Sequence, residues 1–240
     1  MSKATRDIAV VVPTYNERDN LEPLAREVLA SPLRPRLIVV DDHSPDGTGR
    51  LAEELARRNS HLRVIHRPLK LGLGTAYIAG FRRALDEGAQ RIVTMDADFS
   101  HHPRYLTALV ESSDRWGLVI GSRYVPGGGA LNCGLGRRVL SRSANLFART
   151  MLGLRVQDCT AGFRCYRREV LESIDLDHIF SDGYSFLIEM LYNCQQLDWP
   201  IGEIPILFED RRQGKSKISR AEIGKALMTV LRLSLHRFRG

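Results

Sequence analysis

Short apolar runs alternate with helix-like stretches through the first half of the chain. Residues 8–12, 37–40 and 91–94 are largely apolar or β-branched, which is the pattern of strands that are buried on both faces of a parallel sheet. Leucines recur between these runs at helical spacing, as at Leu21 and Leu24. The alternation predicts an α/β fold with a doubly wound, mainly parallel sheet flanked by helices.

The same patterns predict the other elements. Further strands are expected at 62–65, 118–121 and 201–208. One helix is expected to begin at 44–46, and others are expected near 75–87, 103–112, 136–152, 184–197 and 219–238. Pro205 favours a place near the sheet edge for the 201–208 strand, because proline donates no backbone hydrogen bond. We expect one catalytic domain over 1–218, followed by an amphipathic basic helix over 219–240.

Composition narrows the class of protein only coarsely. The 240 residues are 43% hydrophobic and 26% charged, which are ordinary globular values, and the net charge is +7. A positive excess suits a nucleic acid, an anionic membrane or a charged substrate. The polar start has no signal-peptide pattern, and no apolar stretch approaches the roughly 18 residues of a membrane span. We therefore expect a cytoplasmic protein whose membrane contacts are peripheral or made through a partner.

Acidic residues follow several of the predicted strands. Asp41 and Asp42 follow the strand expected at 37–40, and Asp96 and Asp98 follow the strand expected at 91–94. Ligands of such sheets bind beyond the carboxyl ends of the strands. Residues i and i+2 of an extended segment point the same way, so Asp96 and Asp98 can converge on one hard cation. Mg²⁺ and Mn²⁺ use such carboxylates together with substrate phosphates, which predicts an enzyme that handles a diphosphate.

Four motifs in chain order carry a resemblance to a known family. They are PTYNE at 13–17, VVDD at 39–42, DAD at 96–98 and RRQGKSK at 211–217. Further matching pieces lie at 71–76, 95–101, 121–124 and 159–168. The set resembles glycosyltransferase family 2, and within it the polyprenol- and dolichol-phosphate mannose synthases, over about residues 7–220. The resemblance implies a GT-A-type fold, a nucleotide-sugar donor, Mg²⁺ or Mn²⁺, and a lipid-phosphate acceptor.

The resemblance also implies a role for each matching residue. The nucleotide sugar would contact Pro13, Tyr15, Glu17, Val40, Asp42, Met95, Asp96, Ala97, Asp98, Arg211 and Lys217. The metal would lie at Asp96, Asp98 and Ser100, where Ser100 replaces the longer glutamine of many relatives. The acceptor phosphate would be held by Arg123, Arg164 and Arg167. The catalytic group would be Asp98, Arg123, Arg211 and Lys217.

The implied reaction is an inverting, metal-dependent transfer of mannose from GDP-mannose to a polyprenyl (dolichyl-type) monophosphate at the cytoplasmic membrane face. A membrane-anchoring partner protein is a further expectation. Transfer from UDP-glucose or another donor keeps the same fold and stays open. A nucleic-acid-binding module is supported by charge alone, since no helix-turn-helix, RNA-recognition or zinc motif is evident, and we expect no nucleic-acid partner. The C-terminal helix has two open interpretations: it lies at a membrane interface, or it packs on its own domain.

Overall fold

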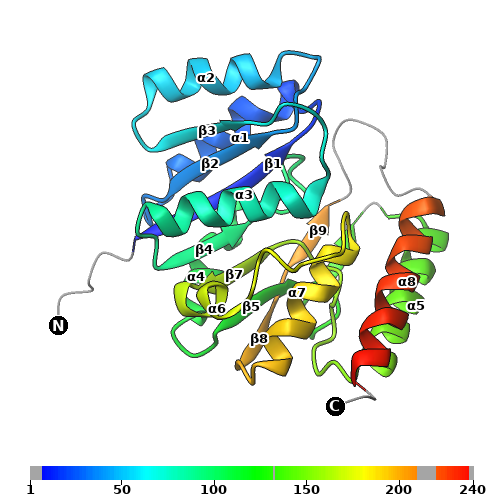
Figure 1. Ribbon diagram of the computed structural model, residues 1–240. Coiled ribbons are helices and arrows are strands. Elements are labelled where there is room, and N and C mark those ends of the chain that lie inside the picture. Colours follow the sequence, from blue (N-terminus) through cyan, green and yellow to red (C-terminus); the bar gives the residue numbers. More distant parts are fainter. Residues whose placement is uncertain (1–6, 132, 210–219, 238–240) are drawn as a thin grey trace.

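A seven-stranded sheet runs through the centre of the molecule and is covered by helices on both faces (Figure 1). The computed structural model describes residues 7–131, 133–209 and 220–237. The strand order is β3-β2-β1-β4-β7-β5-β8. The strands are β1 (Ile8–Thr14), β2 (Arg36–Asp41), β3 (Leu62–His66), β4 (Arg91–Thr94), β5 (Leu118–Ser122), β7 (Arg164–Arg167) and β8 (Ile201–Pro205). All neighbours pair in parallel except β7, which runs antiparallel between β4 and β5.

Alternate side chains of the strands enter two cores, one on each face of the sheet. In β1, Val11 packs with α3 and α7, whereas Val10 and Val12 pack with α1 and α4. The helices are α1 (Arg18–Leu29), α2 (Thr48–Arg58), α3 (Leu73–Asp86), α4 (Leu106–Ser112), α5 (Leu135–Leu152), α6 (Arg168–Ser173), α7 (Ser185–Gln196) and α8 (Arg220–Arg237). A 3-10 turn, η1 (Pro103–Tyr105), leads into α4.

The predicted α/β fold and its parallel strands are confirmed, and β8 lies at the sheet edge as Pro205 indicated. Three elements were not predicted: β7, α6 and the short strand β6 (Gly129–Leu131). β7 has the sequence RCYR, and its two arginines do not fit the apolar pattern of a buried strand, although its first three residues are buried. The predicted 201–208 strand is divided, because after β8 the chain continues as β9 (Leu207–Glu209), which pairs with β6 in a second, two-stranded sheet.

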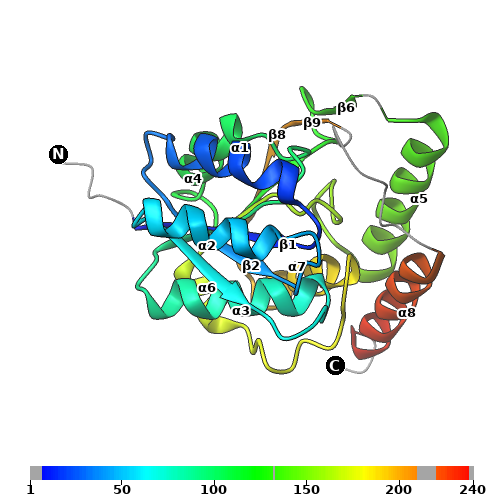
Figure 2. The same ribbon diagram turned by 90° about the horizontal axis from the view of Figure 1, so that it is seen from above.

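Helices α5 and α8 lie side by side at the end of the molecule away from α1 and α2 (Figure 2). α8 packs on both α5 and α7, and its Val230 and Leu233 are buried in the same core as α7. The C-terminal helix is therefore part of the packed structure. None of the described helices is long and apolar enough to cross a membrane.

Candidate active site

The acidic residues named from sequence lie just after the carboxyl ends of parallel strands. β4, β1 and β2 are parallel neighbours, so the segments that follow them leave the sheet on the same side. Asp96 and Asp98 follow β4, and Asp42 follows β2. All three aspartates therefore follow the carboxyl ends of parallel strands, where ligands of such sheets bind.

Asp96 and Asp98 differ in their surroundings. The Asp96 carboxylate is partly exposed, and its Oδ1 lies 3.3 Å from the Tyr77 hydroxyl that donates to it. Burial and the nearby Asp96 raise the pKa of Tyr77 well above its usual value, so Tyr77 keeps its proton. Asp98 is buried, and its Oδ1 accepts hydrogen bonds from the Ser100 hydroxyl at 2.6 Å and the Ser100 amide at 3.1 Å. Ser100 therefore fixes the rotamer of Asp98.

The oxygen atoms here fit a weakly held hard cation. Asp96, Asp98 and Ser100 offer only oxygen, which Mg²⁺ and Mn²⁺ prefer. Across the described parts of the chain, no three His, Cys, Asp or Glu side chains are grouped to hold a metal. His101 accepts a hydrogen bond at Nδ1 from the Asp96 amide and stacks on Phe163, which are structural roles. A cation at this site would take most of its ligands from a bound diphosphate and from water.

A cavity of about 470 Å³ begins at these carboxylates and extends between the helices. Asp96, Asp98 and Arg123 line its polar part. Its apolar part is lined by Leu140, Ala144 and Phe147 of α5, Leu187 and Ile188 of α7, and Ala226, Leu227 and Val230 of α8. One cavity thus joins a charged site to an apolar passage.

Arg123 reaches this cavity as one half of an ion pair. Its Nε and Nη2 donate to the two oxygens of Asp158, both at 2.7 Å, and Nη2 also donates to Thr160 at 2.9 Å. Burial acts to raise the pKa of Asp158, but the charge and hydrogen bonds of Arg123 outweigh it, and that pKa lies below the usual range. Asp158 was missed from sequence, because nothing in one sequence pairs a lone aspartate with an arginine 35 positions away.

The two other arginines assigned to the acceptor phosphate do not lie in that site. Arg164 is fully buried, and its guanidinium donates to the carbonyls of Cys159, Ala161 and Leu187. Arg167 pairs in register with Arg91, the first residue of β4. It therefore lies at the amino end of β4, whereas the aspartates follow the carboxyl end. The prediction is wrong for both residues. Arg164 stabilises the loop before β7 through hydrogen bonds to its carbonyls. Because β7 runs antiparallel to β4, Arg167 lies at the end of the strand away from the site.

Several residues that were predicted to contact the nucleotide lie around the carboxyl ends of β1 and β2. Asp42 pairs with Arg67 at 2.7 Å and accepts from the Gly72 amide at 3.1 Å. Burial raises the pKa of Asp42, although the Arg67 charge opposes the shift. Lys70 lies over the ring of Tyr15, with its Nζ 4.0 Å from the ring centroid. Arg67 and Lys70 were missed from sequence, although Lys70 directly precedes the LGLGTA motif at 71–76 and Arg67 lies four residues before it.

Other residues of the predicted set have structural contacts. Glu17 precedes α1 and accepts from Asn20, and its amide donates to Thr48 at 3.0 Å. The side chains of Val40 and Met95 are buried in the core, so only their main chain can face a ligand. The predicted phosphate-binding residues Arg211 and Lys217 lie outside the described residues.

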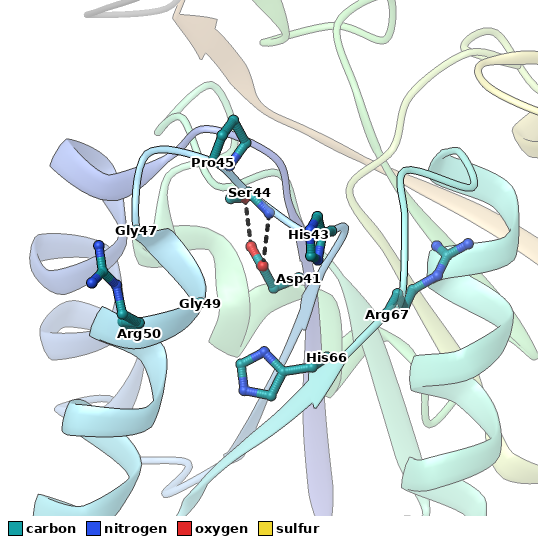
Figure 3. A pocket seen from close by; sticks show the side chains of 9 residues that line it. All are labelled: Asp41, His43, Ser44, Pro45, Gly47, Gly49, Arg50, His66 and Arg67. Carbon is teal, nitrogen blue, oxygen red and sulfur yellow. Dashed lines mark hydrogen bonds between the residues drawn. The ribbon is translucent and has the colours of Figure 1, made fainter.

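Asp41 lines a smaller pocket of about 200 Å³ (Figure 3). Its carboxylate accepts from the amide and hydroxyl of Ser44, which closes the loop before α2. The other residues that line the pocket are His43, Pro45, Gly47, Gly49, Arg50, His66 and Arg67. The neighbouring aspartates therefore have different partners: Asp41 accepts hydrogen bonds from Ser44, whereas Asp42 pairs with Arg67.

Comparison with known proteins gives the family. The family model for glycosyl transferase family 2 matches residues 9–175, which is more than half of the chain. The chain belongs to glycosyl transferase family 2. This family 2 glycosyltransferase is 44% identical over 244 residues to the polyprenol monophosphomannose synthase of Mycolicibacterium smegmatis, covering 99% of this chain and 92% of that protein. It is 43% identical over 228 residues to the undecaprenyl-phosphate mannosyltransferase of Micrococcus luteus, covering 95% of this chain and 94% of that protein.

A solved structure supports the fold of this family 2 glycosyltransferase. The glucosyl-3-phosphoglycerate synthase of Mycobacterium tuberculosis, crystallised with Mn²⁺, UDP and glucosyl-3-phosphoglycerate, superposes with a TM-score of 0.67 and 25% identity. The match covers 95% of this chain and 80% of that one. The expected GT-A-type architecture is confirmed.

Proposed function

We propose that this enzyme transfers mannose from GDP-mannose to a polyprenyl monophosphate, with inversion at the anomeric carbon, giving polyprenyl-phosphate-mannose and GDP. The observation that carries the proposal is the cavity that joins the Asp96–Asp98 site to an apolar passage between α5, α7 and α8. A charged end and an apolar end suit an acceptor that has a phosphate head and a hydrocarbon tail. The two mannosyl-transferring relatives, similar over nearly their full length, support the sugar and the acceptor class.

The chemistry requires orientation and charge compensation. The acceptor phosphate is ionised near neutral pH, since its second pKa is about 6, and it needs no general base. Its oxygen attacks the anomeric carbon as the bond to the donor's diphosphate breaks. Mg²⁺ or Mn²⁺ bound at Asp96 and Asp98 would neutralise the charge that develops on that leaving group. Ser100 holds Asp98 in position for this task. Arg123, which is oriented by Asp158, would hold the acceptor phosphate.

The donor's nucleoside would lie over the ends of β1 and β2. We assign Pro13, Tyr15, Glu17 and Asp42 to the nucleoside. Val40, Met95 and Ala97 would contribute through the main chain. Arg211 and Lys217 would close over the diphosphate. The enzyme would act at the cytoplasmic membrane face, as a peripheral protein or with a membrane-anchoring partner.

A transfer assay tests the proposal. The protein is incubated with polyprenyl phosphate, Mg²⁺ or Mn²⁺, and labelled GDP-mannose or UDP-glucose in parallel, and the label in extracted lipid is measured. We expect lipid-linked mannose from GDP-mannose, and its loss when the cation is chelated. Product from UDP-glucose but not from GDP-mannose would instead favour the alternative donor.

A pair of variants tests the metal assignment. We expect Asp98→Ala to reduce transfer by at least about a hundredfold, in the range reported for removal of one electrostatic stabilising group. Asp177→Ala is the matched control, because Asp177 is an exposed carboxylate whose ion pair with Arg82 lies on the surface. A correctly folded Asp98→Ala protein with undiminished transfer would remove Asp98 from the metal site.

A further inference from the structure

A buried amide on α5 joins that helix to the loop that carries Asp158. Asn145 is 3% exposed, and its side chain does not line the large cavity. Its Oδ1 accepts a hydrogen bond from the Cys159 amide at 2.7 Å. Its Nδ2 donates to the Thr160 hydroxyl at 3.1 Å and to the Ser141 carbonyl of its own helix at 2.9 Å. Both amide protons and the carbonyl oxygen of this side chain therefore have fixed partners.

The Thr160 hydroxyl connects Asn145 to the guanidinium of Arg123. It accepts from Arg123 Nη2 at 2.9 Å and from Asn145 Nδ2, and it donates its proton to Asp158 Oδ1 at 3.4 Å. A hydroxyl has two lone pairs and one proton, so these three contacts use its whole hydrogen-bonding capacity. A displacement of Asn145 would therefore change a direct partner of Arg123.

The segment from Gln157 to Thr160 is held by the sheet as well as by α5. Glu203 of β8 accepts from the Gln157 amide at 2.7 Å and from the Asp158 amide at 3.0 Å. The next two residues, Cys159 and Thr160, bond to Asn145 instead. The sheet thus fixes the first half of the segment, and α5 fixes the second half.

These contacts leave one nitrogen of Arg123 for a ligand. Nε and Nη2 donate to Asp158 and Thr160, whereas Nη1 donates no hydrogen bond to any residue in the described parts of the chain. Arg123 lines the large cavity, and its side chain is 15% exposed. A guanidinium is a rigid planar fork, so partners that fix Nε and Nη2 also fix the direction of Nη1.

We infer that Asn145 is a positioning residue for the acceptor phosphate. From α5 it holds the Cys159 amide and the Thr160 hydroxyl, and it thereby sets the direction in which Arg123 meets the phosphate. The identity of that ligand rests on the proposed function. The network that orients Arg123 does not. Because Asn145 acts on the acceptor side, its loss should impair use of the acceptor and leave binding of the donor unchanged.

Nuclear magnetic resonance of the arginine side chains tests the network without any substrate. In the full chain with ¹⁵N-labelled arginine, the Nε–H signal of Arg123 is identified by its absence from Arg123→Lys. We expect this proton to exchange slowly with water, because it is bonded to a buried carboxylate. Asn145→Ala should accelerate the exchange at least about tenfold, because it removes two of the hydrogen bonds that hold the segment. Thr150→Val is the matched control, because the exposed Thr150 hydroxyl donates to the Leu146 carbonyl within the same helix.

Transfer kinetics test the consequence for the reaction. We expect Asn145→Ala to lower kcat/KM for polyprenyl phosphate about tenfold or more, with the Kd for GDP-mannose unchanged. Thr160→Val removes the connecting hydroxyl with little change of shape and should act in the same way. If Asn145 acts through Thr160, the double variant should lose little more than the more impaired single variant, since losses along one route do not add.

The outcomes separate this role from general support of the fold. Unchanged exchange of the Arg123 proton in Asn145→Ala would overturn the proposal, and so would fully additive losses in the double variant. Equal loss of donor and acceptor affinity would also overturn it, because that result indicates a loosened fold. If Asn145→Ala does not fold, Thr160→Val decides through the same exchange measurement. If the exchange accelerates as expected but the wild type transfers no mannose, the proposed function fails while the positioning of Arg123 stands.

Discussion

The ion pair between Asp158 and Arg123 provides the sharpest test of how the site is built. Asp158 is fully buried, the Arg123 side chain is 15% exposed, and two 2.7 Å hydrogen bonds join them. Asp158→Asn keeps the shape but removes the charge and turns one acceptor into a donor that faces a guanidinium donor. Loss of one partner of a buried pair costs about 3–5 kcal/mol, because the other charge stays buried without compensation. That is a large part of the roughly 5–15 kcal/mol that stabilises a typical domain.

Urea denaturation followed by circular dichroism measures this cost, with Asp177→Asn as the control. Asp177 forms an exposed pair with Arg82, and exposed pairs are worth about 0–1 kcal/mol. The folded pKa of Asp158 is lowered from an ordinary value of 3.8, so its stabilising contribution is present above pH 3.8 and is lost as the pH falls toward the folded pKa. The deficit of Asp158→Asn relative to wild type should therefore shrink in acid. A deficit below about 1 kcal/mol at neutral pH would refute the argument from burial.

Three further predictions concern the metal, the arginines and the packing of α3. Calorimetry should find Mn²⁺ binding weak in the free protein and much tighter with GDP present, and tight binding without nucleotide would contradict the oxygen set described above. Arg164→Met should destabilise by at least about 3 kcal/mol, because it removes the guanidinium that donates to three buried carbonyls, whereas Arg167→Met should cost less than about 1 kcal/mol; equal losses in denaturation would be inconsistent with these environments. Gly80→Ala should lower the thermal midpoint, at a cost of about 1–3 kcal/mol, because the new Cβ would lie 2.2 Å from Val11 Cγ1, whereas Gly136→Ala meets nothing within 4 Å and should not destabilise.

Local patterns determined much of the fold. The continuous apolar runs of β1 and β2 identify strands that are buried on both faces, and this burial requires helices on each side. A parallel sheet then places Asp42, Asp96 and Asp98 after the carboxyl ends of their strands, on the same side of the sheet, and this follows from topology and spacing alone. The family resemblance also follows from sequence, because it depends on motif order and not on contacts.

Only the tertiary structure decided what the arginines do. Nothing in the sequence distinguishes the environments of Arg123, Arg164 and Arg167. In the structure, Arg123 reaches the cavity and Arg164 is buried against carbonyls. Arg167 lies beside the amino end of β4, away from the aspartates. The difference comes from the antiparallel insertion of β7 and from Asp158, both of which depend on long-range pairing. The cavity between α5, α7 and α8 is likewise a product of packing among distant segments. Sequence determined which strands are followed by acidic residues, whereas packing decided which charged side chains meet, because burial and charge pairing arise only when distant segments come together.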